Sequence, residues 1–151
     1  MKIVSVIGAS QATAEHLDLA YEVGKIVAET GAALLCGGMG GIMSAAAKGA
    51  KENNGLTIGI LPNDDKTGAN PYIDIAIPTG LGQARNVITA YSGDVIIALP
   101  GKYGTLTEIG FALSKDKIIL GLYTWDIPGI EQIDGLEVLK TRLTELLSQE
   151  S

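Results

Sequence analysis

Short apolar segments without polar alternation recur along the chain, and they constrain its fold more than any other feature. Each segment is rich in β-branched or aliphatic residues, and a longer stretch with helical spacing separates most of them. Strands without alternation are typical of a parallel sheet that helices cover on both faces. The predicted strands are Ile3–Ile7, Ala33–Cys36, Thr57–Leu61, Ile73–Ile77, Asp94–Leu99 and Ile118–Tyr123.

The stretches between these segments predict the covering helices. Apolar residues from Leu17 to Ala28 recur at helical spacing, with charged residues on the opposite side. The stretch Ile42–Ala50 is apolar or small nearly all round, which is typical of an interior helix, and leucines between Leu136 and Leu147 predict a closing helix. This alternation predicts an α/β fold: a single doubly wound, mostly parallel, Rossmann-like sheet with helices on both faces, in one domain over residues 1–151.

Composition excludes several classes of function. Eleven Lys and Arg against 17 Asp and Glu give a net charge of −6, the opposite of a duplex-binding protein. The chain has one cysteine, Cys36, and one histidine, His16, so it cannot form an intramolecular disulfide or a Cys/His zinc site. The uncharged stretch from Thr30 to Ala47 contains five glycines, so we predict a strand, a loop and a helix start rather than a membrane span. We expect a cytoplasmic protein without metal, cofactor, nucleic-acid or membrane partner, since the first apolar run is too short for a signal peptide.

Glycine-rich loops follow the predicted strands. In a doubly wound sheet, ligands bind beyond the carboxyl ends of the strands. The glycine-containing loops at 8–11, 37–41 and 100–105, together with the loops at 62–72 and 78–82, are therefore expected to converge on one cleft. The loop Gly37–Gly41 opens a helix, and its N–H groups could face an anion; alternatively, its glycines allow close packing of helix on sheet. It lacks both the G-x-G-x-x-G and the G-K-[ST] pattern, which disfavours NAD and a P-loop. The candidate ligand-binding residues here are Gly8, Ser10, Gly37, Gly38, Gly40, Gly41 and Met43.

A second loop, from Pro100 to Glu108, also runs from a strand into a helix. Thr105 with Glu108 three residues later predicts a capping box, which is a sufficient structural reason for both residues. Alternatively, amides of this loop could hold a phosphate, with the Glu108 carboxylate within one helical turn and aimed at the attached sugar. The candidates for ligand binding are Pro100, Gly101, Lys102, Gly104 and Thr105.

Arg85 is one of two arginines in the chain, the other being Arg142 in the C-terminal helix. It follows the loop Pro78–Gly82 at another predicted helix start. An arginine at this end of a strand, in a chain this poor in arginine, predicts a contact with an anion or a base.

Three pieces of the sequence together resemble the LOG-like superfamily, a group widely mislabelled lysine decarboxylase. They are Cys-Gly-Gly-Met-Gly-Gly-Ile-Met at 36–43, Gly-Gln-Ala-Arg-Asn at 82–86 and Pro-Gly-Lys-Tyr-Gly-Thr-Leu-Thr-Glu at 100–108. The resemblance implies a nucleoside 5′-monophosphate phosphoribohydrolase. It matches Arg85 to the catalytic arginine and Glu108 to the catalytic glutamate, and Gly101, Gly104 and Thr105 to the phosphate loop.

Two residues depart from the hydrolase pattern: Lys102 replaces the usual second glycine, and Asn86 stands where lysine is usual. Arg-Asn resembles a branch that includes molybdenum-cofactor carrier proteins, which bind a phosphorylated pterin without turnover. We therefore predict binding of a phosphorylated nucleotide-type ligand, with hydrolysis of its N-glycosidic bond as the candidate reaction. The alternatives are a non-enzymatic carrier of molybdenum cofactor or a related phosphorylated pterin, and a sensor of a signalling nucleotide.

The predicted helix after Thr105 is apolar on more than one side. Leu106, Ile109 and Leu113 share one face, whereas Phe111 and Ala112 fall elsewhere. An apolar patch left outside the core predicts a homo-oligomer, a dimer or higher.

Overall fold

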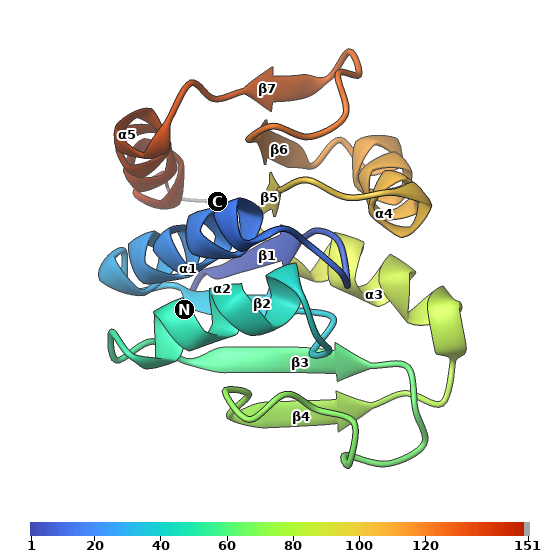
Figure 1. The fold of residues 1–151 in the computed structure, drawn as a ribbon. Coiled ribbons are helices and arrows are strands. Elements are labelled where there is room, and N and C mark those ends of the chain that lie inside the picture. The colour runs from blue at the N-terminus through green and yellow to red at the C-terminus, as the bar shows by residue number, and fades with distance from the viewer. Residues whose placement is uncertain (150–151) are drawn as a thin grey trace.

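In the computed structural model, residues 1–149 are described and form a seven-stranded sheet with helices on both sides (Figure 1). The strands are β1 Ile3–Ile7, β2 Ala33–Cys36, β3 Thr57–Leu61, β4 Ile75–Pro78, β5 Val95–Ala98, β6 Ile118–Gly121 and β7 Ile130–Gln132. The helices are α1 Ala14–Glu29, α2 Ile42–Lys51, α3 Arg85–Ser92, α4 Tyr103–Ser114 and α5 Leu136–Leu147, with a 3-10 turn η1 at Gly82–Ala84.

The sheet has the strand order β4-β3-β2-β1-β5-β6-β7, and every neighbouring pair is parallel. The first four strands extend from β1 toward one edge and the last three toward the other, so the order reverses between β1 and β5. This is a doubly wound α/β sheet, and the predicted fold class is confirmed. The point of reversal is where such sheets open a crevice for ligands.

Two apolar clusters cover the two faces of the sheet. The larger contains buried residues of α1, α2 and α5 packed on residues such as Val4 and Leu34. The smaller contains residues of α3 and α4 packed on Ile7 and Ile96. Ser5 points to this second face, where its hydroxyl donates a hydrogen bond to the Thr89 carbonyl at 2.8 Å. Helices therefore lie on both faces, as the unalternating strands predict.

Strands β5 and β6 are each two residues shorter than predicted, and two further strands differ more from the prediction. The strand predicted over Ile73–Ile77 begins at Ile75 instead, because the Ile73 N–H is bonded to the Asn70 carbonyl in a turn. It is not buried on both faces: β4 is an edge strand, and Ile75 and Ile77 are 45% and 44% exposed. The three-residue strand β7 was not predicted, since Ile130–Gln132 contains no apolar run.

The uncharged stretch from Thr30 to Ala47 divides into β2, a glycine turn and the start of α2, as predicted. No helix within residues 1–149 combines the length and the apolar character needed to cross a membrane.

Candidate functional site

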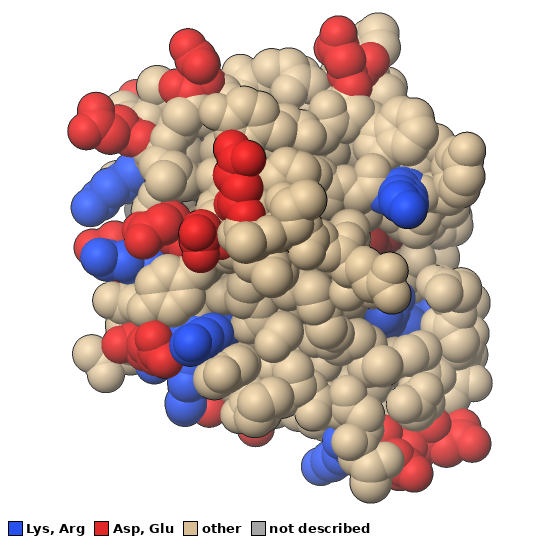
Figure 2. Space-filling model, in the orientation of Figure 1, with Lys and Arg blue, Asp and Glu red and all other residues tan. Residues whose placement is uncertain are grey.

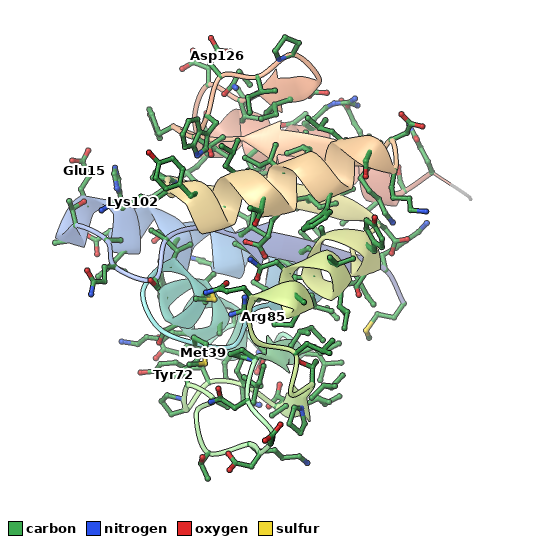
Figure 3. The ribbon with its side chains drawn as sticks, turned by 90° about the vertical axis from the view of Figure 1, so that its right-hand side faces the viewer. Glu15, Met39, Tyr72, Arg85, Lys102 and Asp126 are labelled. Atoms are coloured by element: carbon green, nitrogen blue, oxygen red, sulfur yellow. The ribbon has the colours of Figure 1, made fainter. Side chains whose placement is uncertain are left out.

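The carboxyl ends of β1 and β2 and the starts of α3 and α4 enclose a pocket of about 280 Å³. It lies at the point where the strand order reverses. In Figure 3, α3 and α4 lie side by side, with Arg85 at the start of α3 and Lys102 at the start of α4. The lining residues are Val6, Ile7, Gly8, Ala9, Ser10, Gln11, Gly37, Met43, Gln83, Arg85, Asn86, Lys102, Gly104, Thr105 and Glu108.

The structure brings most of the sequence-predicted residues to this one pocket, although they come from four segments that are separate in the sequence. Those at the pocket are Gly8, Ser10, Gly37, Met43, Arg85, Lys102, Gly104, Thr105 and Glu108. The others do not line it, namely Gly38, Gly40, Gly41, Pro100 and Gly101. The loops 62–72 and 78–82, which were expected to converge on the same cleft, contribute no lining residue, and the second of them is followed directly by the lining residue Gln83.

Two of the glycines outside the lining, Gly38 and Gly41, have packing roles. Gly38 and Gly41 have positive φ angles of 77° and 65°. A Cβ on Gly38 would lie 2.5 Å from Leu61 Cδ2, and one on Gly41 would lie 2.4 Å from the Ser10 carbonyl. The close-packing alternative therefore holds for these two positions. At Gly37, by contrast, a Cβ would lie 2.9 Å from Arg85 Nη2, so this glycine makes room for the guanidinium.

Arg85 is the first residue of α3, and it is only 8% exposed. Its Nε donates to the Ile60 carbonyl at 2.9 Å, and its Nη1 donates to Asn86 Oδ1. None of the ion pairs formed within residues 1–149 includes it. Burial lowers the pKa of Arg85, whereas the nearby Glu108 raises it. Because arginine stays protonated in proteins, the pocket holds a buried cation without an ion-pair partner.

Glu108 lies on α4 and is 7% exposed. Burial raises the pKa of its carboxyl from 4.5 to about 8, and Arg85 opposes part of that shift. Glu108 also takes part in no ion pair within residues 1–149. A buried acid with a strongly raised pKa in a cleft is typical of sites where a proton is gained or lost during function.

The predicted capping box at Thr105 and Glu108 is wrong. Helix α4 begins at Tyr103, its N-cap is Lys102, and no side chain caps it. The helix starts earlier than the Thr-x-x-Glu pattern indicates, so Thr105 lies within the first turn. There its Oγ1 is close to Gly101, where a Cβ would lie 2.0 Å away. Glu108 is therefore not engaged in capping, and it lines the pocket instead.

The first turns of α2 and α4 both contribute to the pocket lining, through Met43 and through Gly104 and Thr105. Neither helix has a side-chain hydrogen bond at its N-cap. The first N–H of α2, on Ile42, already donates to the Ala9 carbonyl at 2.9 Å. At a helix start, unbonded N–H groups and the positive end of the helix dipole together favour an anion. The pocket therefore offers helix N-termini, a buried guanidinium and the Lys102 side chain to one ligand.

Three polar lining residues were not among the predicted site residues: Gln11, Gln83 and Asn86. Gln11 follows Ser10 in the loop after β1, so its place in the chain was a usable signal. Gln83 lies in η1, within the Gly-Gln-Ala-Arg-Asn segment that carries the family resemblance, and that segment was a usable signal. Asn86 stood out only as a departure from the hydrolase motif, and the structure places it in contact with Arg85. Cys36 is fully buried, and burial raises the pKa of its thiol to about 11.

A parallel sheet with an anion-suited pocket at its switch point defines a Rossmann-like α/β protein of the class that places small ligands at strand ends. The chain belongs to the SLOG cluster4 family, which it matches over residues 1–148. It is 43% identical to an uncharacterized protein of Archaeoglobus fulgidus, over 91% of this chain and 87% of that one. It is 35% identical to a cytokinin riboside 5′-monophosphate phosphoribohydrolase of Mycobacterium tuberculosis, over 78% of this chain and 67% of that one.

Among solved structures, a molybdenum cofactor carrier protein from Chlamydomonas reinhardtii is similar with a TM-score of 0.87 and 33% identity. The match covers 98% of this chain and 99% of that chain. The predicted resemblance to the LOG-like superfamily is confirmed. Relatives of both kinds, a phosphoribohydrolase and a cofactor carrier, are similar to most of this chain.

Proposed function

We propose that the pocket binds a small phosphorylated ligand of the nucleotide type. The observation that carries this proposal is the buried Arg85 guanidinium, which has no ion pair within residues 1–149 and lies in a pocket lined by a helix start. A buried unpaired charge is costly, and a phosphate would compensate it. The phosphate accepts from Arg85 and from the first N–H groups of α4, and Lys102 adds a second cation at the same end.

Binding calorimetry with AMP and with inorganic phosphate tests this proposal. The two arginines provide a matched pair, because Arg142 lies on the far helix α5 and pairs with Glu131 and Glu145. We expect Arg85→Gln to abolish AMP binding and Arg142→Gln to leave it unchanged. Equal affinities in the two variants, or no binding by the wild-type protein of AMP or other nucleoside monophosphates, contradict the proposal.

For a nucleoside 5′-monophosphate, the proposed reaction is hydrolysis of the N-glycosidic bond. The C1′–N bond breaks with an oxocarbenium-like state on the sugar, and a carboxylate at Glu108 stabilises the developing positive charge. The hydroxyl of a water molecule bonds to C1′, and the water proton leaves with the base. The products are ribose 5-phosphate and the free base.

Base release from AMP and from other nucleoside monophosphates, followed by chromatography, tests the hydrolase proposal. Glu108→Gln keeps the shape of the side chain and removes its ionisation. We expect at least a hundredfold loss of turnover in this variant, roughly the size of other losses of electrostatic transition-state stabilisation. If the wild-type protein releases base no faster than Glu108→Gln on every substrate, the hydrolase proposal is contradicted, and only the proposal of ligand binding remains.

The second candidate function is non-enzymatic carriage of molybdenum cofactor or a related phosphorylated pterin. The similarity that favours it extends over 98% of this chain and 99% of the Chlamydomonas carrier. Copurification of a fluorescent pterin, or thermal stabilisation by one, tests this function. A ligand at 100 times its Kd adds about 2.7 kcal/mol to the free energy of unfolding, which is large enough to measure. Absence of both effects counts against the carrier.

We also propose a homo-oligomer, at least a dimer, in which a second copy of this chain covers α3 and α4. The only charged residues of these two helices are Arg85 and Glu108, and both are buried. In Figure 2, the right-hand part of the molecule, over α3 and α4, shows few charged atoms compared with the left. Because each copy carries a charge of −6, two copies approach with least repulsion through such a face. Its exposed apolar side chains are Leu81, Ile88, Tyr103 and Phe111, with Ile75 and Ile77 of β4 on the same side of the sheet.

Ala112 does not belong to that patch, although the sequence analysis placed it with Phe111. It is fully buried against Ile109 in the smaller core cluster. Small-angle scattering of the wild-type protein tests the oligomer: we expect at least twice the chain mass of 15.6 kDa. A monomeric mass at all accessible concentrations contradicts it.

A further inference from the structure

We propose that Asn86 is a positioning residue that joins Arg85 to the first turn of α4 through a directional chain of hydrogen bonds. The inference assigns a role to a residue that the hydrolase motif does not contain, and its ligand-binding consequence rests on the proposed function. Its structural consequence, a fixed guanidinium, can be measured without any ligand.

The chain of hydrogen bonds crosses from α3 to α4. Arg85 Nη1 donates to Asn86 Oδ1. The other end of the carboxamide, Nδ2, donates to Thr107 Oγ1 at 3.4 Å and lies 3.5 Å from Gln83 Oε1. The Thr107 hydroxyl in turn donates to the Gly104 carbonyl at 2.6 Å. Along the series from Arg85 through Asn86 and Thr107 to Gly104, each donor points toward the start of α4, while Asn86 Nδ2 also donates to Gln83. Hydrogen bonds aligned in this way polarise and strengthen one another.

These hydrogen bonds determine which part of the Arg85 guanidinium a ligand can reach. Nε is already bonded to the Ile60 carbonyl at the end of β3, and Nη1 to Asn86. Nη2 is the remaining nitrogen, and it lies beside Gly37 in the pocket lining. Contacts on two edges hold the planar guanidinium in one orientation, so Nη2 is presented at a fixed distance from the Gly104 turn. A phosphate held by both sites gains from that preorganisation.

The chemistry of position 86 explains why asparagine suits this role. The side chain must accept from Arg85 at one atom and donate to Thr107 at another, and a carboxamide does both. A lysine, which is usual here in the resembling hydrolases, has donors only and would place a second cation against Arg85. An aspartate has acceptors only and could not donate to Thr107, whose own proton is directed at Gly104. Asn86 is 4% exposed, so no bulk water replaces a lost partner.

The first experiment observes the guanidinium directly. The chain has two arginines, so ¹⁵N-detected spectra contain two arginine Nε–H signals, and Arg142 is an internal reference. We expect hydrogen exchange of the Arg85 Nε–H to accelerate about tenfold in Asn86→Leu and about threefold in Thr107→Val, consistent with the loss of one hydrogen bond. The Arg142 signal should not change.

Thr107 provides the sharper variants, because it is exposed and its replacement should not prevent folding. Thr107→Ser keeps the hydroxyl and should restore wild-type exchange. Thr144→Val is the matched control: Thr144 is also an exposed helical threonine, its hydroxyl is bonded to the Lys140 carbonyl at 2.7 Å, and it lies on α5. Identical Arg85 exchange in wild type, Thr107→Val and Asn86→Leu overturns the inference, as does a Thr107→Ser variant that behaves like Thr107→Val.

The second experiment measures the Kd of AMP in the same variants. We expect about threefold weaker binding in Thr107→Val and unchanged binding in Thr107→Ser and Thr144→Val, again from one hydrogen bond. Unchanged affinity in Thr107→Val overturns the proposed link to the ligand. If the wild-type protein binds no AMP, the proposed function fails, and the exchange measurement still decides the role of Asn86.

Discussion

At the scale of single residues, the free energy of burying Glu108 depends on pH. In the unfolded chain its carboxyl ionises near the ordinary pKa of 4.5, whereas in the folded protein it keeps its proton up to about 8. Between these values the folded state binds more protons than the unfolded state, so its stability falls as pH rises. The loss begins near pH 4.5 and is complete above about pH 8.

Glu108→Gln should therefore be more stable than wild type at pH 9, by a few kcal/mol, since each pKa unit corresponds to about 1.4 kcal/mol. The difference should shrink steadily as pH is lowered to 5, because both side chains are then neutral in the folded protein. Urea unfolding of the two proteins between pH 5 and pH 9 measures it. A stability difference that stays constant over this range contradicts the raised pKa.

The protonation state of Glu108 should affect ligand binding and hydrolysis in opposite ways. Below about pH 8 the folded Glu108 is neutral, and a dianionic phosphate meets no repulsion beside Arg85. We expect the affinity for AMP to weaken several-fold between pH 7 and pH 9 in the wild type and to stay constant in Glu108→Gln. Hydrolysis, which uses the carboxylate, should instead become faster at saturating substrate as pH rises toward 8. Calorimetry and base release over the same pH series measure both, and affinity that is independent of pH in the wild type contradicts this expectation.

At the scale of elements, helices α1 and α2 pack through two glycines. A Cβ on Gly24 of α1 would lie 1.9 Å from the Ala46 carbonyl oxygen, and one on Gly49 of α2 would lie 2.0 Å from the Tyr21 carbonyl oxygen. These obstacles are backbone atoms, which cannot move without separating the helices. The close approach keeps α2, and with it the loop that ends at Gly41, against the sheet.

We expect Gly24→Ala to lower the free energy of unfolding by about 3 kcal/mol, the upper part of the range for overpacking. Gly110→Ala in α4 is the matched control, because a Cβ there meets no atom within 4 Å. In that variant alanine should be neutral or stabilise the helix by up to about 1 kcal/mol. Chemical denaturation of both variants measures the difference. Equal stabilities would show that the two helices can separate at little cost.

At the scale of the whole molecule, the prediction concerns the uncharged face of α3 and α4. Phe111 on this face is 36% exposed, and Val138 on α5 is 48% exposed and serves as the matched control. In a twofold interface each substitution occurs twice, so Phe111→Glu should place two like charges in one apolar contact. We expect Phe111→Glu to shift the mass to that of one chain and Val138→Glu to leave the oligomer intact. Light scattering with a thermal unfolding control measures this, and a Phe111→Glu variant that still forms the oligomer argues against this face.

Local patterns were sufficient for the elements that touch the core. Six strands, the helices over them and the position of Arg85 at a helix start follow from apolar periodicity and glycine placement. Local patterns failed where contacts between distant residues determine the burial or the existence of a strand. The edge position of β4 exposes Ile75 and Ile77, and β7 is held by its pairing with β6 rather than by its own three residues.

The amino-acid sequence by itself determined a doubly wound α/β fold with its glycine loops at the strand ends, because buried parallel strands and tight turns require particular residue types locally. Only the tertiary structure determined which residues line the pocket and how each is buried, ionised and hydrogen-bonded. The Thr105–Glu108 pattern fitted a cap, yet the earlier start of α4 places Glu108 in the pocket. The contact of Arg85 with Ile60 joins residues 25 apart in sequence, and the relay from Asn86 to Thr107 joins residues 21 apart. Burial, pKa and hydrogen-bond direction depend on such distant neighbours, which no local pattern contains.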